Sequence, residues 1–313
     1  SFIDNLDRKF IDKVYKTIKF TNNLKQDLIS QFNEVELMLS QVISFSSTEK
    51  IFRESLLQFW KYYKESLLNS KTILVTRQFF EQKWLLNSVN YLKYNKNQII
   101  LSKKINIPII ICASGPSLYN SIKIIQDSAS KVFIIGLSSA IKVLLENQII
   151  PDLVFSTDGG FWAGRHIKIL SKQLLDIPIA ISAESYIPKN ILSTNKTLLL
   201  NYQDGISSYL ISKFNLKSNN AKRNGTVSGT ALEFALENRD NVPIYFCGLD
   251  LSSQKGFQHI NPNELENDNQ INDNRINTKT LREYKSEIND NSIKIYKEWF
   301  STQKTNNVYR VIE

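Results

Sequence analysis

The chain has 313 residues, of which 42% are hydrophobic and 22% charged, so it can form a hydrophobic core and is not disordered as a whole. The net charge is +9, and the basic residues are spread along the chain without a basic run that is interleaved with aromatics. This argues against a nucleic-acid partner and suits an anionic small molecule. No apolar run reaches the length of a membrane span, and no signal peptide is evident at the N-terminus.

Residues 1–100 predict helices, because apolar side chains recur every three to four residues, as in the segment 51–68. Neither Gly nor Pro precedes Pro108, which is typical of a helical domain. The aromatic cluster around Phe59 and Trp60 could form core packing or a partner surface. We expect a helical domain over 1–100, and we expect both chain ends to be cut from a longer protein.

From about residue 105, short apolar runs bounded by Pro, Gly, Ser or Asp alternate with helical patterns. The runs are 107–114, 131–139, 151–160, 177–185, 196–203 and 242–251, and the clearest helical patterns are 139–148 and 229–239. Apolar strands without polar alternation are typical of a buried parallel sheet. The prediction is an α/β fold, a Rossmann-like, mostly parallel sheet with flanking helices, over 101–260.

The last part, 261–313, changes character again. Residues 261–278 are rich in Asn and Asp and predict a mobile loop. Residues 279–301 predict a helix, and 306–313 predict a last strand. The two cysteines, Cys112 and Cys247, lie in apolar runs without metal-ligand spacing, so we expect buried, reduced thiols in a cytoplasmic protein.

Small and polar residues follow the predicted strands where each strand ends, and parallel strands end at one edge of the sheet. After the first strand, Ser114, Gly115 and Pro116 form a small-residue turn in which Ser114 fits a helix N-cap and Pro116 a first turn. A glycine and a helix N-terminus suit a phosphate. The turn matches neither a Walker loop nor GxGxxG, so a plain strand-to-helix turn stays open.

Other strand ends carry further candidates. Ser138 follows the second strand, Asp158 and Gly159 follow the third, and Glu184 follows the fourth. Asp158 could bind a ribose hydroxyl or a metal, or could cap the next helix. Glu184 is a candidate substrate contact.

A second helix start lies at 226–229. Thr226, Ser228 and Gly229 lead into a helical pattern, with Lys222 and Arg223 just before them. Hydroxyls, N–H groups and these cations could form a second anion site, with Arg223 touching the substrate. A capping role for the hydroxyls is the alternative.

The sequence has two histidines. His166 lies in a helical pattern and fits a helix surface. His259 follows the last predicted strand of the sheet, at the edge where the polar strand ends gather, and an imidazole there suits general-base chemistry.

Four stretches in this order resemble the motility accessory factor family: "ICASGPSL", "PDLVFSTDGG", "NGTVSGTALEFAL" and "VPIYFCGLDLSSQKGFQH". That family is similar to archaeal 6-hydroxymethylpterin diphosphokinase-like proteins and, more distantly, to small bacterial sialyltransferases. The resemblance covers about residues 100–260. It implies a glycosyltransferase that moves a nonulosonic acid from its CMP-activated form to Ser or Thr of flagellin.

The resemblance also implies roles for single residues. Gly115, Pro116 and Ser117 match the first nucleotide-binding turn, and Thr226, Ser228 and Gly229 match the turn that touches the nucleotide. Asp250 matches the end of a "GxD" strand, which makes it a catalytic candidate. His259 matches, loosely, the histidine base of the sialyltransferases. The tyrosines that support the leaving phosphate there have no clear match, and Tyr284 and Tyr296 are too distant to assign.

Two other functions stay open at this point. A pterin pyrophosphokinase-like enzyme would use ATP and Mg²⁺, with Asp158 and Asp250 as metal ligands. A non-catalytic flagellar binding protein would use the N-terminal helices to hold a partner. No resident cofactor or metal set is predicted, and a divalent metal in the reaction is left open.

Overall fold

The computed structural model describes residues 28, 32, 34–42, 46–171, 176–251, 257, 259–281, 300 and 307–311. Its contacts divide the chain into two compact units, Ser1–Glu81 and Gln82–Glu313. The helices predicted before residue 28, and the helix predicted over 279–301 with Tyr284 and Tyr296, lie largely or wholly outside the described residues. In the described part, no helix combines the length and the apolar character that crossing a membrane requires.

The first unit is helical in its described part, as predicted. Its helices are α3 (Glu34–Leu39), α4 (Ser46–Ile51) and the first part of α5 (Arg53–Tyr94), which continues into the second unit. Tyr63 is buried beside Leu37, and its ring stacks on Phe59 at 5.8 Å between centroids. The aromatic cluster therefore contributes to the core of this unit.

The second unit is built on a parallel sheet of nine described strands. The strands are β1 (Gln98–Ile99), β2 (Ile109–Cys112), β3 (Phe133–Leu137), β4 (Leu153–Phe155), β5 (Ile179–Ile181), β6 (Thr197–Asn201), β7 (Asn219–Asn220), β8 (Ile244–Cys247) and β9 (Val308–Arg310). Their order is β1-β6-β5-β4-β3-β2-β8-β9, with β7 beside β6, and every pair is parallel. The predicted α/β class and the predicted last strand are confirmed.

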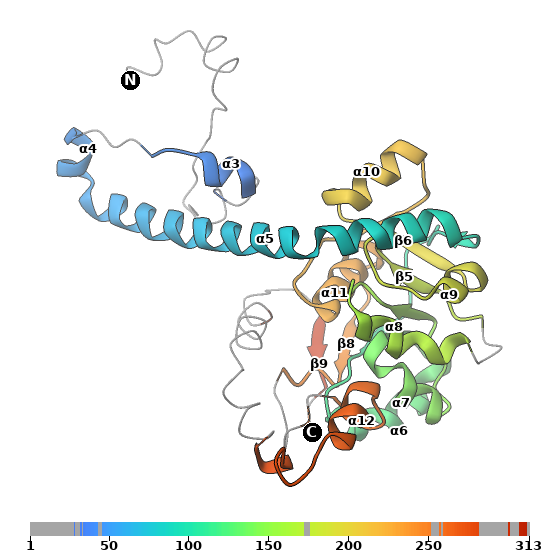
Figure 1. The fold of residues 1–313 in the computed structure, drawn as a ribbon. Helices are drawn as coiled ribbons and strands as arrows, with labels where there is room; N and C mark the ends of the chain where they lie inside the picture. The colour runs from blue at the N-terminus through green and yellow to red at the C-terminus, as the bar shows by residue number, and fades with distance from the viewer. Residues whose placement is uncertain are drawn as a thin grey trace. The chain divides into compact units, whose positions relative to one another are not determined.

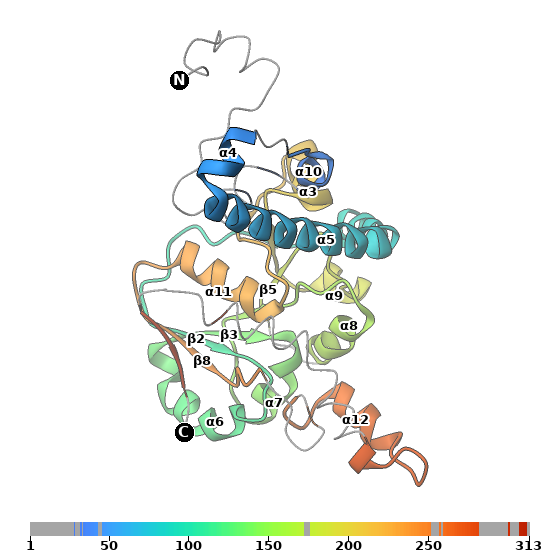
Figure 2. The ribbon, with the colours of Figure 1, turned by 90° about the vertical axis from the view of Figure 1, so that its left-hand side faces the viewer.

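Helices cover both faces of this sheet. They are α6 (Leu118–Ser128), α7 (Ile141–Glu146), α8 (Phe161–Ile167), α9 (Lys189–Thr194), α10 (Gly205–Phe214), α11 (Val227–Asn238) and α12 (Glu264–Ile271), with short 3₁₀ turns η2 (Ala129–Lys131), η3 (Ser138–Ala140) and η4 (Lys168–Ser171). Figures 1 and 2 show α11 on one face and α6 and α7 on the other. The sheet therefore has a hydrophobic core on each face. One core includes the buried sides of α6 to α10, and the other includes the buried side of α11.

The central strands are apolar throughout because both of their faces are covered. β2, β4 and β5 are buried at every position. Cys112 at the end of β2 pairs in register with Cys247 at the end of β8, and both are free thiols. β2 has β3 on one side and β8 on the other. The chain therefore changes direction across the sheet at β2, and such a switch point is where sheets of this kind bind ligands.

The prediction of a mobile loop over 261–278 is wrong in its first half, where α12 forms. Asn263 caps this helix, because its side chain accepts a hydrogen bond from the N–H of Leu265 at 2.9 Å. Glu264 and Glu266 lie in the first turn, where negative charge favours the helix. Capping and ion pairs therefore replace the apolar stripe that sequence patterns detect.

Candidate functional site

A pocket of about 250 Å³ opens at the switch point, at the carboxyl ends of β2, β3 and β8. Ser114 and Gly115 line it from the first turn, and Val227 and Ser228 line it from the start of α11. His259 also lines it, as do Ser139 and Asp250. The expectation that the two turns share one edge of the sheet is confirmed, because both line the same pocket.

The first turn is held by packing against the end of β8. The N–H of Gly115 donates to the carbonyl of Gly248 at 2.8 Å, and a Cβ at Gly115 would lie 2.5 Å from that oxygen. Close packing against the end of β8 is thus a sufficient reason for glycine at position 115, without a role in phosphate binding.

The expected N-cap role of Ser114 is wrong. The helix begins at Leu118, two residues after Pro116, and the hydroxyl of Ser114 instead accepts a hydrogen bond from Ser139 at 2.7 Å. The difference arises because Ser114 still belongs to the extended segment that leaves β2.

Asp250 lies against the start of α6. One carboxylate oxygen accepts a hydrogen bond from the N–H of Ser117 at 2.8 Å, and the other accepts from the Ser117 hydroxyl. Arg310 of β9 lies 3.7 Å from the same carboxylate. Asp250 lines the pocket, but these partners make it a residue that holds the turn in place. The catalytic role predicted from the resemblance gains no support from this geometry.

The second turn starts α11 and is capped by Thr226. The Thr226 hydroxyl accepts a hydrogen bond from the N–H of Gly229 at 2.9 Å, and Ser228 donates to that hydroxyl at 3.2 Å. A Cβ at Gly229 would lie 2.2 Å from the side-chain oxygen of Asn224, so glycine is needed for this packing. Capping is therefore the role that the structure shows for Thr226, while Ser228 reaches the pocket.

His259 and Glu266 form a dyad at the pocket. The Oε1 atom of Glu266 accepts a hydrogen bond from the backbone N–H of His259 at 3.0 Å and lies 3.3 Å from its Nδ1. A carboxylate only accepts hydrogen bonds, so in the neutral form of the imidazole this contact favours the tautomer with the proton on Nδ1 and Nε2 as acceptor. The side chain of Glu266 is 1% exposed and that of His259 is 23% exposed. The dyad therefore has a buried carboxylate and an accessible imidazole.

The second histidine of the sequence lies beside the first. The ring of His166, on α8, lies 6.2 Å from the ring of His259, centroid to centroid. Burial, and then the neighbouring His259, lower the pKa of His166 to about 4. His166 is therefore neutral at pH 7. The prediction of a helix surface residue missed this contact, because nothing local in the sequence links residues 93 positions apart.

The helix α12 is fixed to the rest of the unit by polar contacts. Asn263 donates to the carbonyl of Ser139 at 2.9 Å, which joins α12 to the pocket wall. Glu264 lies 3.3 Å from Lys142 of α7 and 3.6 Å from Arg165 of α8. These contacts place Glu266 behind the imidazole.

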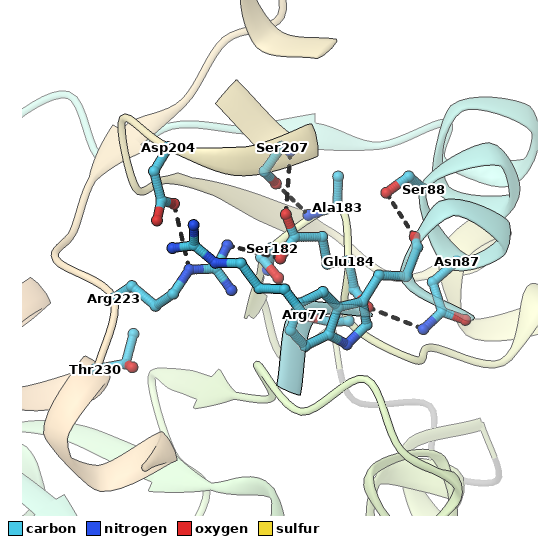
Figure 3. A network of polar contacts seen from close by, with 12 residues as sticks. Arg77, Asn87, Ser88, Ser182, Ala183, Glu184, Asp204, Ser207, Arg223 and Thr230 are labelled. Atoms are coloured by element: carbon cyan, nitrogen blue, oxygen red, sulfur yellow. Dashed lines mark hydrogen bonds and ion pairs between the residues drawn. The ribbon is translucent and has the colours of Figure 1, made fainter. Parts of the chain in front are cut away.

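Glu184 and Arg223 form a separate network beyond β5 and β6 (Figure 3). The buried carboxylate of Glu184 accepts a hydrogen bond from Arg223 at 2.7 Å and from the N–H of Ser207 at 3.3 Å. Arg223 also contacts Asp204 at 3.3 Å. Its guanidinium lies 4.6 Å from the ring centroid of Tyr202. Both predicted substrate residues are thus paired with each other, and neither lines the pocket.

The remaining predicted residues have local partners. The Asp158 carboxylate accepts from the N–H of Gly160 at 2.9 Å, so it caps the turn before α8. A Cβ at Gly159 would lie 2.6 Å from the Trp84 ring, so this glycine packs against α5.

Ser138 is buried in η3, and its neighbour Ser139 lines the pocket instead. Among the described residues, no group of three His, Cys, Asp or Glu is placed to hold a metal ion.

Comparison with known proteins identifies the family. The family model of 6-hydroxymethylpterin diphosphokinase MptE-like proteins matches residues 82–256, more than half of the chain. The chain belongs to this MptE-like family. The match begins at the first residue of the second unit. The resemblance to this family, stated from the motifs, is confirmed, whereas the resemblance to sialyltransferases stays a prediction.

This MptE-like chain is similar to a curated protein and to a solved structure. An uncharacterized protein of Treponema pallidum (strain Nichols) is 28% identical over 243 residues, which are 77% of this chain and 52% of that protein. The chain thus spans about half the length of this relative. The structure of the MAf glycosyltransferase from Magnetospirillum magneticum AMB-1 matches with a TM-score of 0.46 and 19% identity, over 60% of this chain and 32% of that one.

The MptE-like segment supplies both turns of the pocket, but the dyad follows it in the sequence. His259 and Glu266 lie after residue 256, where the family match ends. Sequence reasoning singled out His259 and missed Glu266. The one available signal was the acidic first turn of a capped helix after Asn263, which the high content of Asn and Asp concealed.

Proposed function

We propose that the chain is a glycosyltransferase that moves a nonulosonic acid from a CMP-activated donor to Ser or Thr hydroxyls of flagellin. The observation that carries the proposal is the His259–Glu266 dyad on a pocket formed by two helix starts. Transfer to a hydroxyl needs a base for the hydroxyl proton and hydrogen-bond donors for the leaving phosphate. The buried free thiols of Cys112 and Cys247 suit a reducing compartment, so we place the reaction in the cytoplasm.

The charge of the pocket favours a donor with a single phosphate. In the described part of the lining, the ionisable side chains are Asp250 and His259, without Lys or Arg. Phosphate would therefore be held by N–H groups and hydroxyls at the start of α11, where the helix dipole adds a partial positive charge. A CMP-sugar has one phosphodiester group. The polyphosphate of ATP carries several more charges and is usually neutralised by cations.

The reaction can be written with the residues of the pocket. The acceptor hydroxyl oxygen attacks the anomeric carbon of the sugar while the bond from that carbon to the phosphate oxygen breaks. The hydroxyl proton passes to Nε2 of His259, and CMP leaves with the bonding electron pair. N–H and O–H groups at the starts of α6 and α11 would stabilise the phosphate charge that develops by donating hydrogen bonds to it. The pocket, at about 250 Å³, is small for a whole nucleotide sugar, so the donor would extend beyond it.

The name of the family makes a pterin diphosphokinase the competing function. That enzyme would need Asp158 and Asp250 to share magnesium. Asp158 follows β4 and Asp250 follows β8, three strand positions apart, which corresponds to roughly 14 Å. Ligands of one magnesium ion lie about 2 Å from it, so these two carboxylates do not suit a shared site.

The test compares donors and then measures transfer. Titration calorimetry with CMP and with ATP plus Mg²⁺ is expected to show binding of CMP. Incubation with flagellin and a CMP-nonulosonic acid is expected to add the mass of the sugar to flagellin. His259→Ala should bind CMP as the wild type does and should transfer at least 100-fold more slowly.

Magnesium-dependent binding of ATP in place of CMP would instead support the diphosphokinase. Normal transfer to flagellin by His259→Ala would show that His259 is not the base, whereas no transfer by the wild type would favour the non-catalytic function.

A further inference from the structure

We propose that Glu266 is the positioning residue of the site: its carboxylate holds the imidazole of His259 in the one tautomer and orientation that can accept a proton at the pocket. This proposal rests on the proposed function for its reaction, although its geometry does not. Glu266 touches neither donor nor acceptor in this scheme and acts through His259.

Two contacts of one oxygen fix the imidazole. Oε1 of Glu266 accepts from the backbone N–H of His259 at 3.0 Å and also faces Nδ1 at 3.3 Å. The first contact fixes the main chain and the second fixes the rotation of the ring. Because Nδ1 is occupied by its proton and its acceptor, the lone pair on Nε2 is left for the pocket that His259 lines.

The burial of Glu266 points to a specific role. A carboxylate that is 1% exposed loses its hydration, and this cost is met only where hydrogen-bond donors replace water. Donors here include the two N–H groups of His259 and the side-chain amide of Asn269, which lies 3.4 Å from the other oxygen. His259 therefore contributes two of the hydrogen bonds that compensate for this burial.

The surroundings of the ring support the same orientation. His166 of α8 contacts His259, and its pKa of about 4 keeps it uncharged at pH 7. Glu264 and Arg165, which also face His166, lie 3.6 Å apart as an ion pair. Among the residues that the structure describes, the charged group hydrogen-bonded to the His259 ring is the carboxylate of Glu266.

The carboxylate has a defined part in the proton transfer. As the acceptor hydroxyl gives its proton to Nε2, the imidazole becomes a cation. The proton on Nδ1 stays on the ring, hydrogen-bonded to Oε1, and the carboxylate stabilises the positive charge. No proton reaches Glu266, so the number of protons balances between hydroxyl and imidazole.

The first experiment is ¹⁵N NMR of protein labelled on histidine. The sequence has only two histidines, so the spectrum holds two sets of ring signals. The wild type is expected to show His259 protonated on Nδ1. Glu266→Ala is expected to lose this signature. Glu266→Gln, which keeps the Oε1 acceptor, should retain it in part. Asp268→Asn is the matched control on the same helix and should leave the His259 signals unchanged.

The second experiment measures kinetics. Glu266→Ala should lower kcat by 10- to 100-fold with an unchanged KM for the donor. In a His259→Ala background the same change should have no further effect, since it acts through the imidazole. An unchanged tautomer in folded Glu266→Ala, or an equal loss of kcat in both backgrounds, would overturn the proposal. The NMR result needs no sugar donor, so it decides this inference even if His259→Ala shows that the proposed reaction is wrong.

Discussion

Asp250 accepts hydrogen bonds from both the backbone N–H and the hydroxyl of Ser117, and so joins the end of β8 to the start of α6. The two residues are 133 positions apart in the sequence. The contact closes the first turn around the pocket from one side. The carboxylate of Asp250 is nearly buried. Hydrogen bonds to a charged acceptor are stronger than those to a neutral one, and burial strengthens them further.

Removal of this carboxylate should loosen the turn and weaken nucleotide binding together. We expect Asp250→Ala to lower the free energy of unfolding by about 2 kcal/mol, because it leaves the donors of Ser117 without their acceptor. Urea denaturation and CMP titration measure the two effects. Asp127→Asn, at an exposed position of α6, is the control. Loss of transfer in Asp250→Ala with normal stability and normal CMP binding would instead restore a direct catalytic role.

Gly248 should tolerate no side chain. Its φ is +72°, and a Cβ would lie 2.4 Å from the carbonyl oxygen of Ala113. We expect Gly248→Ala to destabilise the protein by at least about 2 kcal/mol, measured by chemical denaturation. Gly160→Ala is the comparison, because its nearest atoms lie 3.3 Å away, and it should cost clearly less. Equal losses of unfolding free energy in the two variants would contradict the importance of the close contact between the ends of β2 and β8.

The ion pair of Glu184 and Arg223 should respond asymmetrically to substitution. Arg223→Met leaves a carboxylate that is 4% exposed without its main partner, so a loss of about 3 kcal/mol is expected. Glu184→Gln leaves a guanidinium that is 30% exposed and still bound to Asp204, so the loss should be closer to about 1 kcal/mol. Thermal denaturation of the two variants and of the double variant checks this. A larger cost for Glu184→Gln would contradict it.

Stability should fall as the pH is lowered from 6.5 toward 4. His166 has a pKa of about 4 in the folded protein against 6.5 for the ordinary side chain. In this window the unfolded chain binds a proton that the folded chain does not, so protonation favours unfolding by an amount on the order of 2 kcal/mol. His166→Gln should flatten this part of the pH profile of the unfolding free energy. The same slope in the variant would assign the effect to other groups.

The sequence predicts the sheet well because its strands are apolar on both faces and end in turn residues. The runs at 107–114 and 242–251 each contain a strand of the structure, β2 and β8. The shared edge of the sheet also follows from topology alone, since parallel strands all present their carboxyl ends there. The pocket at Ser114 and Ser228 was predictable on this ground.

What the sequence does not predict depends on contacts between distant residues. Glu184 and Arg223 pair with each other 39 positions apart, so their charges are not directed at the pocket. The helix α12 is stabilised by capping and by ion pairs with α7 and α8, and a low apolar content hides such a helix. Glu266 becomes recognisable only once α12 is placed behind His259.

The register of β2 and β8 places Cys112 and Cys247, both thiols of the chain, side by side at the ends of these strands, directly before the pocket turns. Burial raises the pKa of both thiols, so alkylating reagents should modify neither in the native state. The rate of labelling then reports how often β2 and β8 separate. The chain thus contains its own probe for local opening at the nucleotide pocket, and a ligand that binds there should slow the labelling.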